Sequence, residues 1–156
     1  MSEVPSISEL KKQEQLIRIR DFDHDAAWLI GSKIRDKAIA KQFPVAIEVY
    51  AYGQTMFLTA LPGSSSEHLE WIERKRNTVL RNARSSLLTG EEYKEQQLSM
   101  ENLPYIDAKR YTDSGGSFPL LTTTGCVFGA VTVSGLASHE DHALAVWAIE
   151  QYLTTQ

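Results

Sequence analysis

The chain has 156 residues, a formal net charge of −4 and a single cysteine. With 42% apolar and 23% charged residues, the composition fits one globular domain and excludes a mainly disordered chain, a disulfide scaffold and a cysteine-rich zinc site. A mildly acidic protein lacks the basic surface of a nucleic-acid binder, no apolar run approaches the roughly 18 residues of a membrane span, and the polar first residues lack a secretory signal. We therefore expect a cytoplasmic protein that binds neither nucleic acid nor a membrane.

The first half of the chain predicts two helices, a β-hairpin and a third helix. Apolar residues recur at helical spacing in the first two segments, and the second helix must end before Pro44. Strict alternation predicts the strands, and Gly53-Gln54 is suited to the tight turn between them. The expected helices span 7–20, 25–42 and 66–83, and the expected strands span 45–51 and 55–61.

The second half predicts a polar helix, an irregular segment, a second hairpin and a last helix. The irregular segment, 102–117, is long for a compact domain, and such loops are usually functional or mobile. The strand from Cys126 is apolar on both faces, so we expect it to lie centrally with Cys126 as a buried thiol. Ser138 is suited to cap the last helix. The expected helices here span 86–100 and 138–153, and the expected strands span 118–123 and 126–134.

These elements predict an α+β domain, in which helices pack around a central antiparallel sheet of four to five strands. We expect one domain over residues 1–156, with residues 1–20 as an N-terminal helical extension.

A cationic strip along the third helix is the first candidate site. Arg74, Thr78 and Arg81 lie on one helical face, with Lys75 beside them. Such a strip suits an anion, whether a carboxylate, a phosphate or an acidic partner surface. The alternative is a solvated helix face, because charge runs usually just face water.

Two glycine-containing turns are the second candidate. Gly115-Gly116 lets backbone amides approach a ligand closely, and Ser134-Gly135 joins a strand to the last helix, whose N-terminus is a potential anion site. The alternative is that both are tight turns with no ligand.

Two histidines of the last helix are the third candidate. His139 and His142 flank Asp141 and could contribute to a metal site, or Asp141 and His142 could form an acid/base pair. The spacing places no third metal ligand, so surface and capping roles are the alternative.

Several of these residues belong to short motifs that follow one another along the chain. The motifs are Trp71-x-x-Arg74-Lys75-x-Asn77-Thr78-Val79, Ser85-Ser86, Gly115-Gly116-x-Phe118-Pro119-Leu120, Gly125-x-x-x-Gly129-x-x-x-Val133-Ser134-Gly135-Leu136 and Asp141-His142. Over residues 20–153 the chain resembles an uncharacterised branch of the haem-degrading domain family, related to the HbpS and GlcG proteins.

The resemblance implies an α+β domain, homo-oligomers, and the haem binding and slow haem breakdown linked to other members. Our first hypothesis is therefore a protein that binds haem or another small anionic ligand, whose carboxylates would pair with Arg74, Lys75, Arg81 or Arg110. The second is a non-enzymatic assembly or partner-binding protein. The third is an enzyme that acts on an anionic metabolite with Asp141 and His142.

Overall fold

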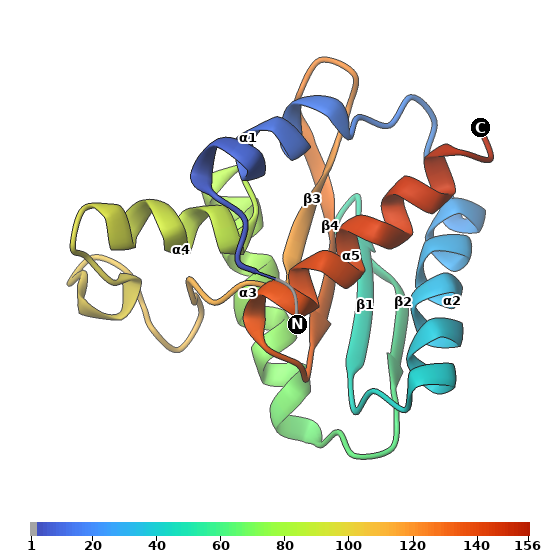
Figure 1. The fold of residues 1–156 in the computed structure, drawn as a ribbon, viewed down its shortest axis with the longest axis horizontal. Coiled ribbons are helices and arrows are strands. Elements are labelled where there is room, and N and C mark those ends of the chain that lie inside the picture. Colours follow the sequence, from blue (N-terminus) through green and yellow to red (C-terminus); the bar gives the residue numbers. More distant parts are fainter. Residues whose placement is uncertain (1–2) are drawn as a thin grey trace.

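A four-stranded antiparallel sheet in the order β2-β1-β4-β3 organises residues 3–156, the part of the chain that this computed structural model describes (Figure 1). The strands are β1 (Ala46–Ala51), β2 (Gln54–Ala60), β3 (Ser117–Leu121) and β4 (Val127–Ser134). The central pair joins segments far apart in sequence, with Ile47 opposite Val133. The expected α+β class and the central position of the strand after Cys126 are confirmed.

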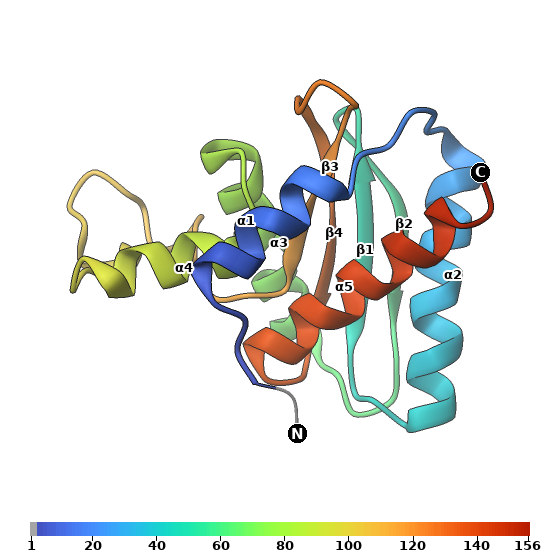
Figure 2. The ribbon, with the colours of Figure 1, turned by 45° about the horizontal axis from the view of Figure 1, so that its top comes forward.

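Helices cover both faces of the sheet. They are α1 (Ile7–Leu16), α2 (His24–Lys41), α3 (Ser66–Asn82), α4 (Ser86–Glu95) and α5 (Ser138–Leu153), with a short 3-10 turn η1 (Met100–Asn102). Helices α2 and α5 pack together on one face and α3 packs on the other, while α1 lies against α4 to one side (Figures 1 and 2).

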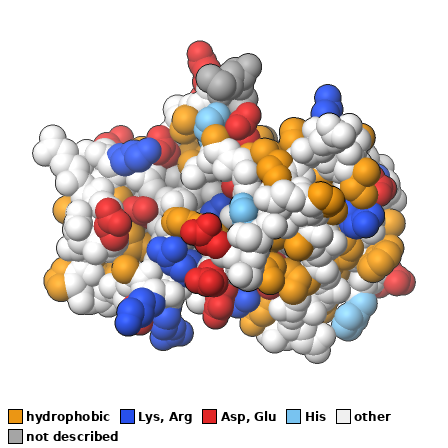
Figure 3. Space-filling view, turned by 90° about the horizontal axis from the view of Figure 1, so that it is seen from below, with side chains coloured by type: hydrophobic (Ala, Val, Ile, Leu, Met, Phe, Trp, Pro, Cys, Tyr) orange, Lys and Arg blue, Asp and Glu red, His pale blue; other side chains and the backbone are white. Residues whose placement is uncertain are grey.

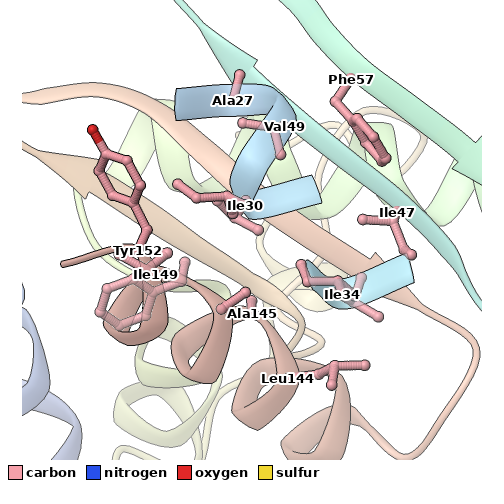
Figure 4. Packing of buried hydrophobic residues seen from close by; sticks show 14 of the residues in the cluster. Ala27, Ile30, Ile34, Ile47, Val49, Phe57, Leu144, Ala145, Ile149 and Tyr152 are labelled. Carbon is pink, nitrogen blue, oxygen red and sulfur yellow. The ribbon is translucent and has the colours of Figure 1, made fainter. Parts of the chain in front are cut away.

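The main core lies between the sheet and the α2–α5 layer (Figure 4). Ile30 and Ile34 of α2 meet Val49 of β1 and Ile149 of α5, and all four side chains are fully buried. Burying each such side chain stabilises the fold by about 1.5–3 kcal/mol, so this layer fixes how α5 lies on the sheet.

One helix start and one turn follow from local chemistry. The Asp23 side chain accepts a hydrogen bond from the Ala26 N–H and caps α2. The hairpin turn is Tyr52-Gly53, so the prediction of Gly53-Gln54 is wrong by one residue. Both turn residues have positive φ, 53° and 78°, as a two-residue hairpin turn of this type requires.

Several predicted boundaries need correction. Helix α1 ends at Leu16 because Ile17 and Ile19 alternate inward with exposed or half-exposed arginines, which is a strand-like pattern. Helix α4 ends at Glu95, shortly before Gln97, whose φ of 60° lies in the left-handed region. Cys126 is exposed rather than buried, because it precedes β4 in the hairpin turn.

The start of α5 also differs, because Ala137 and not Ser138 is its N-cap residue. The predicted extension over residues 1–20 contains α1, and residues 1 and 2 lie outside the described part. No helix in residues 3–156 is both long enough and apolar enough to cross a membrane.

Candidate functional site

A pocket of about 260 Å³ lies where α3 and α5 begin, below the end of β4. Seen from below, this end of the molecule carries acidic and basic side chains side by side near its middle (Figure 3). We call it the Lys75–Asp141 pocket. Its lining residues are Glu67, His68, Trp71 and Lys75 from α3, Ser114 from the preceding loop of β3, Ser134, Gly135 and Leu136 from the β4–α5 corner, and Ser138 and Asp141 from α5.

A buried ion pair forms one wall of the pocket. Lys75 Nζ lies 3.1 Å from Asp141 Oδ2, and the two side chains are 4% and 1% exposed. Nζ also donates to the Val133 carbonyl oxygen at 3.1 Å. The Asp141 carboxylate further accepts from the backbone N–H groups of Leu136 and Gly135, at 2.9 and 3.3 Å. The pair therefore ties α3 to the β4–α5 corner.

Burial opposes both charges of this pair. It lowers the pKa of the Lys75 amine, against the attraction of Asp141. It also raises the pKa of the Asp141 carboxyl, against the attraction of Lys75 and the hydrogen bonds from Leu136 and Gly135. Both shifts lower the free-energy cost of moving a proton from the Lys75 ammonium to the Asp141 carboxylate.

The double glycine lets the loop before β3 approach the ion pair. Gly116 has φ of 138°, and a Cβ there would lie 2.5 Å from the Val133 oxygen and 2.7 Å from Lys75 Nζ. A Cβ on Gly115 would lie 2.9 Å from the carbonyl oxygen of Ser138, at the start of α5. Side chains at either position would push this loop away from the pocket.

Two helix N-termini meet at the pocket, because the first turns of α3 and α5 both line it. Each carries a partial positive charge from the N–H groups of its first turn. His68 of α3 accepts the Ser65 N–H on Nδ1 at 3.0 Å, so the neutral ring carries its proton on Nε2 as a donor.

The candidate residues derived from the sequence do not include His68. His68, Trp71 and Lys75 are three and four residues apart, which puts them on one helical face. This spacing is the signal that could have found it.

The other predicted cations point elsewhere. Arg74 donates to the Ala108 carbonyl oxygen and its guanidinium lies 4.4 Å from the centre of the Trp71 ring. The guanidinium groups of Arg81 and Arg110 lie over the ring of Tyr111, at 5.8 and 5.4 Å. The structure does not bring these arginines together with Lys75 in one pocket.

Thr78 holds the loop that carries the double glycine. Its buried hydroxyl donates to the Thr112 carbonyl oxygen at 2.6 Å and accepts from the Thr112 N–H at 3.0 Å. Of the predicted site residues, Ser134 and Gly135 line the pocket, as Lys75 does, whereas Thr78, Gly115 and Gly116 are not among its lining residues.

Asp141 and His142 point to different sides of α5. His142 is buried, with Nε2 2.8 Å from Gln13 Oε1 of α1, and its ring meets the Phe118 ring edge-on. Its Nδ1 has no hydrogen-bond partner among the described residues, and burial lowers its pKa to about 4. The structure therefore does not bring the predicted acid/base pair together in one pocket.

The structure offers no ready metal centre. His139 lies half-buried in the first turn of α5 and is not among the residues that line the pocket. Within residues 3–156, no three histidine, cysteine or acidic side chains gather as metal ligands.

Known protein sequences are similar to this chain over most of its length. The family model described as "Haem degrading protein HbpS-like" matches residues 22–150. A UPF0303 protein of Streptomyces coelicolor is 40% identical over 149 residues, covering 96% of this chain and 94% of that protein. A UPF0303 protein of Rhizobium rhizogenes is 40% identical over 144 residues, covering 92% of this chain and 88% of that protein.

Solved structures share the fold. The Ybr137w protein superposes with a TM-score of 0.87 at 27% identity, covering 98% of this chain and 90% of that one. HbpS gives 0.66 at 17% identity, covering 87% and 92%. A haem complex of PduOC gives 0.68 at 18% identity, covering 85% and 94%. At such low identities the last two show a common fold.

Proposed function

This chain belongs to the HbpS-like family of haem-degrading proteins, and from that premise we propose that it binds a small ligand in the Lys75–Asp141 pocket. The ligand that the pocket suits best is a small molecule with a carboxylate group. The observation that carries this proposal is the meeting of two helix N-termini over a buried lysine.

The charges around the pocket support a carboxylate. Asp141 is compensated by Lys75 and by two backbone N–H donors, so its charge is already satisfied within the wall. The partial positive charges of the α3 and α5 N-termini are then left for a ligand, with the His68 Nε2–H as a further donor. Glu67 opposes an anion from the exposed rim, which favours a small ligand that sits deep in the pocket.

Haem is the ligand that the family description suggests, and the residues of this pocket do not fit it. Iron bound at His68 Nε2 would need the ring proton on Nδ1, where the Ser65 N–H already donates. His142 Nε2 is taken by Gln13 on the other side of α5. The volume of about 260 Å³ is also below the roughly 300–1,000 Å³ of pockets that enclose larger ligands. Haem is therefore a comparison ligand in the test below.

Calorimetric titration with acetate, pyruvate, oxalate and haem tests the proposal. We expect at least one small carboxylate to bind the wild type. The Lys75→Met variant should lose that binding while its circular dichroism stays folded, because the uncompensated charge of Asp141 would then repel an anion. Lys94→Met is the matched control, because the Lys94 side chain is 78% exposed and pairs with Glu91 at the surface. If no small carboxylate binds, or Lys75→Met binds it as well as the control does, the proposal is wrong.

Assembly with further copies of the chain is the second candidate, and one feature of the sheet favours it. Strand β2 lies at the edge of the sheet and contains no proline or charged residue, so it lacks the usual protection of an exposed edge. Leu58 of β2 and Trp28 of α2 are 51% and 64% exposed. We expect light scattering to show an oligomer that Leu58→Lys weakens, and a wild-type monomer would exclude it.

A further inference from the structure

The amine of Lys75 differs from that of a surface lysine in its hydrogen bonds and in its exposure to solvent. Its Nζ is held by the Val133 carbonyl oxygen and by Asp141 Oδ2, which are its two hydrogen-bond acceptors among the described residues. A lysine nitrogen has a third position beyond these two. The side chain lines the pocket although only 4% of it is exposed, whereas the Lys94 side chain is 78% exposed.

A compensated lysine adds little Coulomb attraction for an anion, because the charge of Asp141 lies 3.1 Å from it. The property that burial gives this amine is nucleophilicity. A desolvated lysine beside a proton acceptor spends more time as the free amine, which is the form that attacks carbonyl carbons.

We propose that Lys75 forms a Schiff base with the carbonyl group of its ligand, which would make the ligand class a small 2-oxo acid or aldehyde acid. This inference rests on the proposed function, since the same pocket must admit the ligand. The carboxylate of such a ligand lies toward the N-termini of α3 and α5, and its carbonyl carbon lies at Nζ.

The chemical step needs no reagent beyond the ligand. Asp141 takes a proton from the Lys75 ammonium, and the free amine attacks the carbonyl carbon to form a carbinolamine. The proton then returns from Asp141 to the carbinolamine hydroxyl, which leaves as water while the C=N bond forms. The electron count of the ligand does not change, and water is the only product released. The direction of both pKa shifts in the pair favours this exchange.

Glycine at position 116 keeps a side chain away from the Lys75 amine. A Cβ at this position would lie 2.7 Å from Nζ, so any side chain there would compete with a carbon bonded to the nitrogen. Trp71, Ser134 and Ser138 also line the pocket and can orient a small polar ligand.

Reductive trapping tests this inference on the wild-type protein. The chain is incubated with glyoxylate and cyanoborohydride near neutral pH, and the modified lysine is identified by peptide mass spectrometry. We expect roughly one carboxymethyl group per chain, on Lys75, well before Lys94 is labelled. Acetaldehyde, which lacks the carboxylate, should label Lys75 more slowly. Lys75→Arg keeps a cation beside Asp141 and should lose the pocket adduct without changing the labelling of surface lysines.

The two proposals fail in different ways. If glyoxylate binds in the pocket by calorimetry but labels Lys94 and other surface lysines instead of Lys75, the Schiff base is excluded and the binding function stands. If glyoxylate neither binds nor labels Lys75, and no other small carboxylate binds, both proposals are excluded. Labelling of Lys75 that persists undiminished when acetate saturates the pocket would also overturn the inference, because the reaction would then not use the binding site.

Discussion

The ammonium group of Lys75 occupies the space that a side chain at position 116 would need. A Cβ on Gly116 would lie 2.7 Å from Nζ and 2.5 Å from the Val133 oxygen, which Nζ itself contacts at 3.1 Å. The glycine and the lysine therefore form one packing unit, and a side chain at position 116 would displace the Lys75 amine.

This relationship predicts a large effect of Gly116→Ala. The new methyl group would clash with Nζ, and a φ of 138° is strained for alanine, so we expect the free energy of unfolding to fall by roughly 2–4 kcal/mol. Urea unfolding measures this change. Gly53→Ala is the matched control, because φ there is also positive, at 78°, and nothing lies within 4 Å of the new Cβ. An equal loss in the two variants would show that backbone strain alone matters.

The ion pair predicts strong coupling between its two members. Lys75→Met leaves a carboxylate buried without its cation, which typically costs about 3–5 kcal/mol. In the double variant Lys75→Met/Asp141→Asn neither residue is charged, and the amide oxygen can still accept the Leu136 N–H. We expect the double variant to be at least about 1 kcal/mol more stable than the sum of the two single effects predicts. Chemical unfolding of all four proteins gives the coupling, and strict additivity would contradict it.

Thr78 and Thr112 predict a local effect on the loop before β3. Thr78→Val removes one hydroxyl that serves both the N–H and the carbonyl of Thr112, so we expect a loss of about 1–3 kcal/mol. Hydrogen exchange should become faster at the amides of residues 112–116. Thr89→Val is the control, because the Thr89 hydroxyl bonds a carbonyl within its own helix and does not hold the loop. Unchanged exchange in the Thr78 variant would refute the tether.

Local sequence patterns predict the secondary structure where one face of an element is apolar. The alternation of Ile47 and Val49 predicts β1, and the helical spacing in residues 25–42 predicts α2. Local patterns do not predict the pairing of β1 with β4, because it joins residues that lie 78 (Ala51 and Gly129) to 88 (Ala46 and Ser134) positions apart, and the packing of α2 and α5 decides it. Boundaries failed where tertiary contacts decide them, as at Ile19, which bridges Thr122.

The candidate site shows a different limit. The sequence places Lys75 in a strip with other cations. Lys75 differs from them because it lies between the buried Ile72 and Val79, at spacings of three and four residues. Because Lys75 lies on the apolar face of α3, the sequence predicts a buried amine that needs an acceptor. Arg74 is not on that face, so the spacing distinguishes the two residues. Sequence could not supply the partner, because Asp141 arrives from α5, 66 positions away.

His142 predicts how stability depends on pH. Its pKa is about 4 in the folded protein and about 6.5 when the chain unfolds, because the folded protein buries the neutral ring. Between these values the unfolded state holds more protons, so stability falls as pH is lowered from about 6.5 to 4 and this contribution is constant outside that range. The whole effect is about 3 kcal/mol. Thermal or urea unfolding from pH 4 to pH 7.5 measures it.

The comparison that isolates this histidine is the difference between wild type and His142→Gln across that pH range. The variant removes the titrating ring, so the difference in unfolding free energy should change by about 3 kcal/mol between pH 6.5 and pH 4. If His142→Gln has the same pH profile as wild type, the buried neutral state of His142 is wrong, and the contact of α1 with α5 through Gln13 must then tolerate a charged ring.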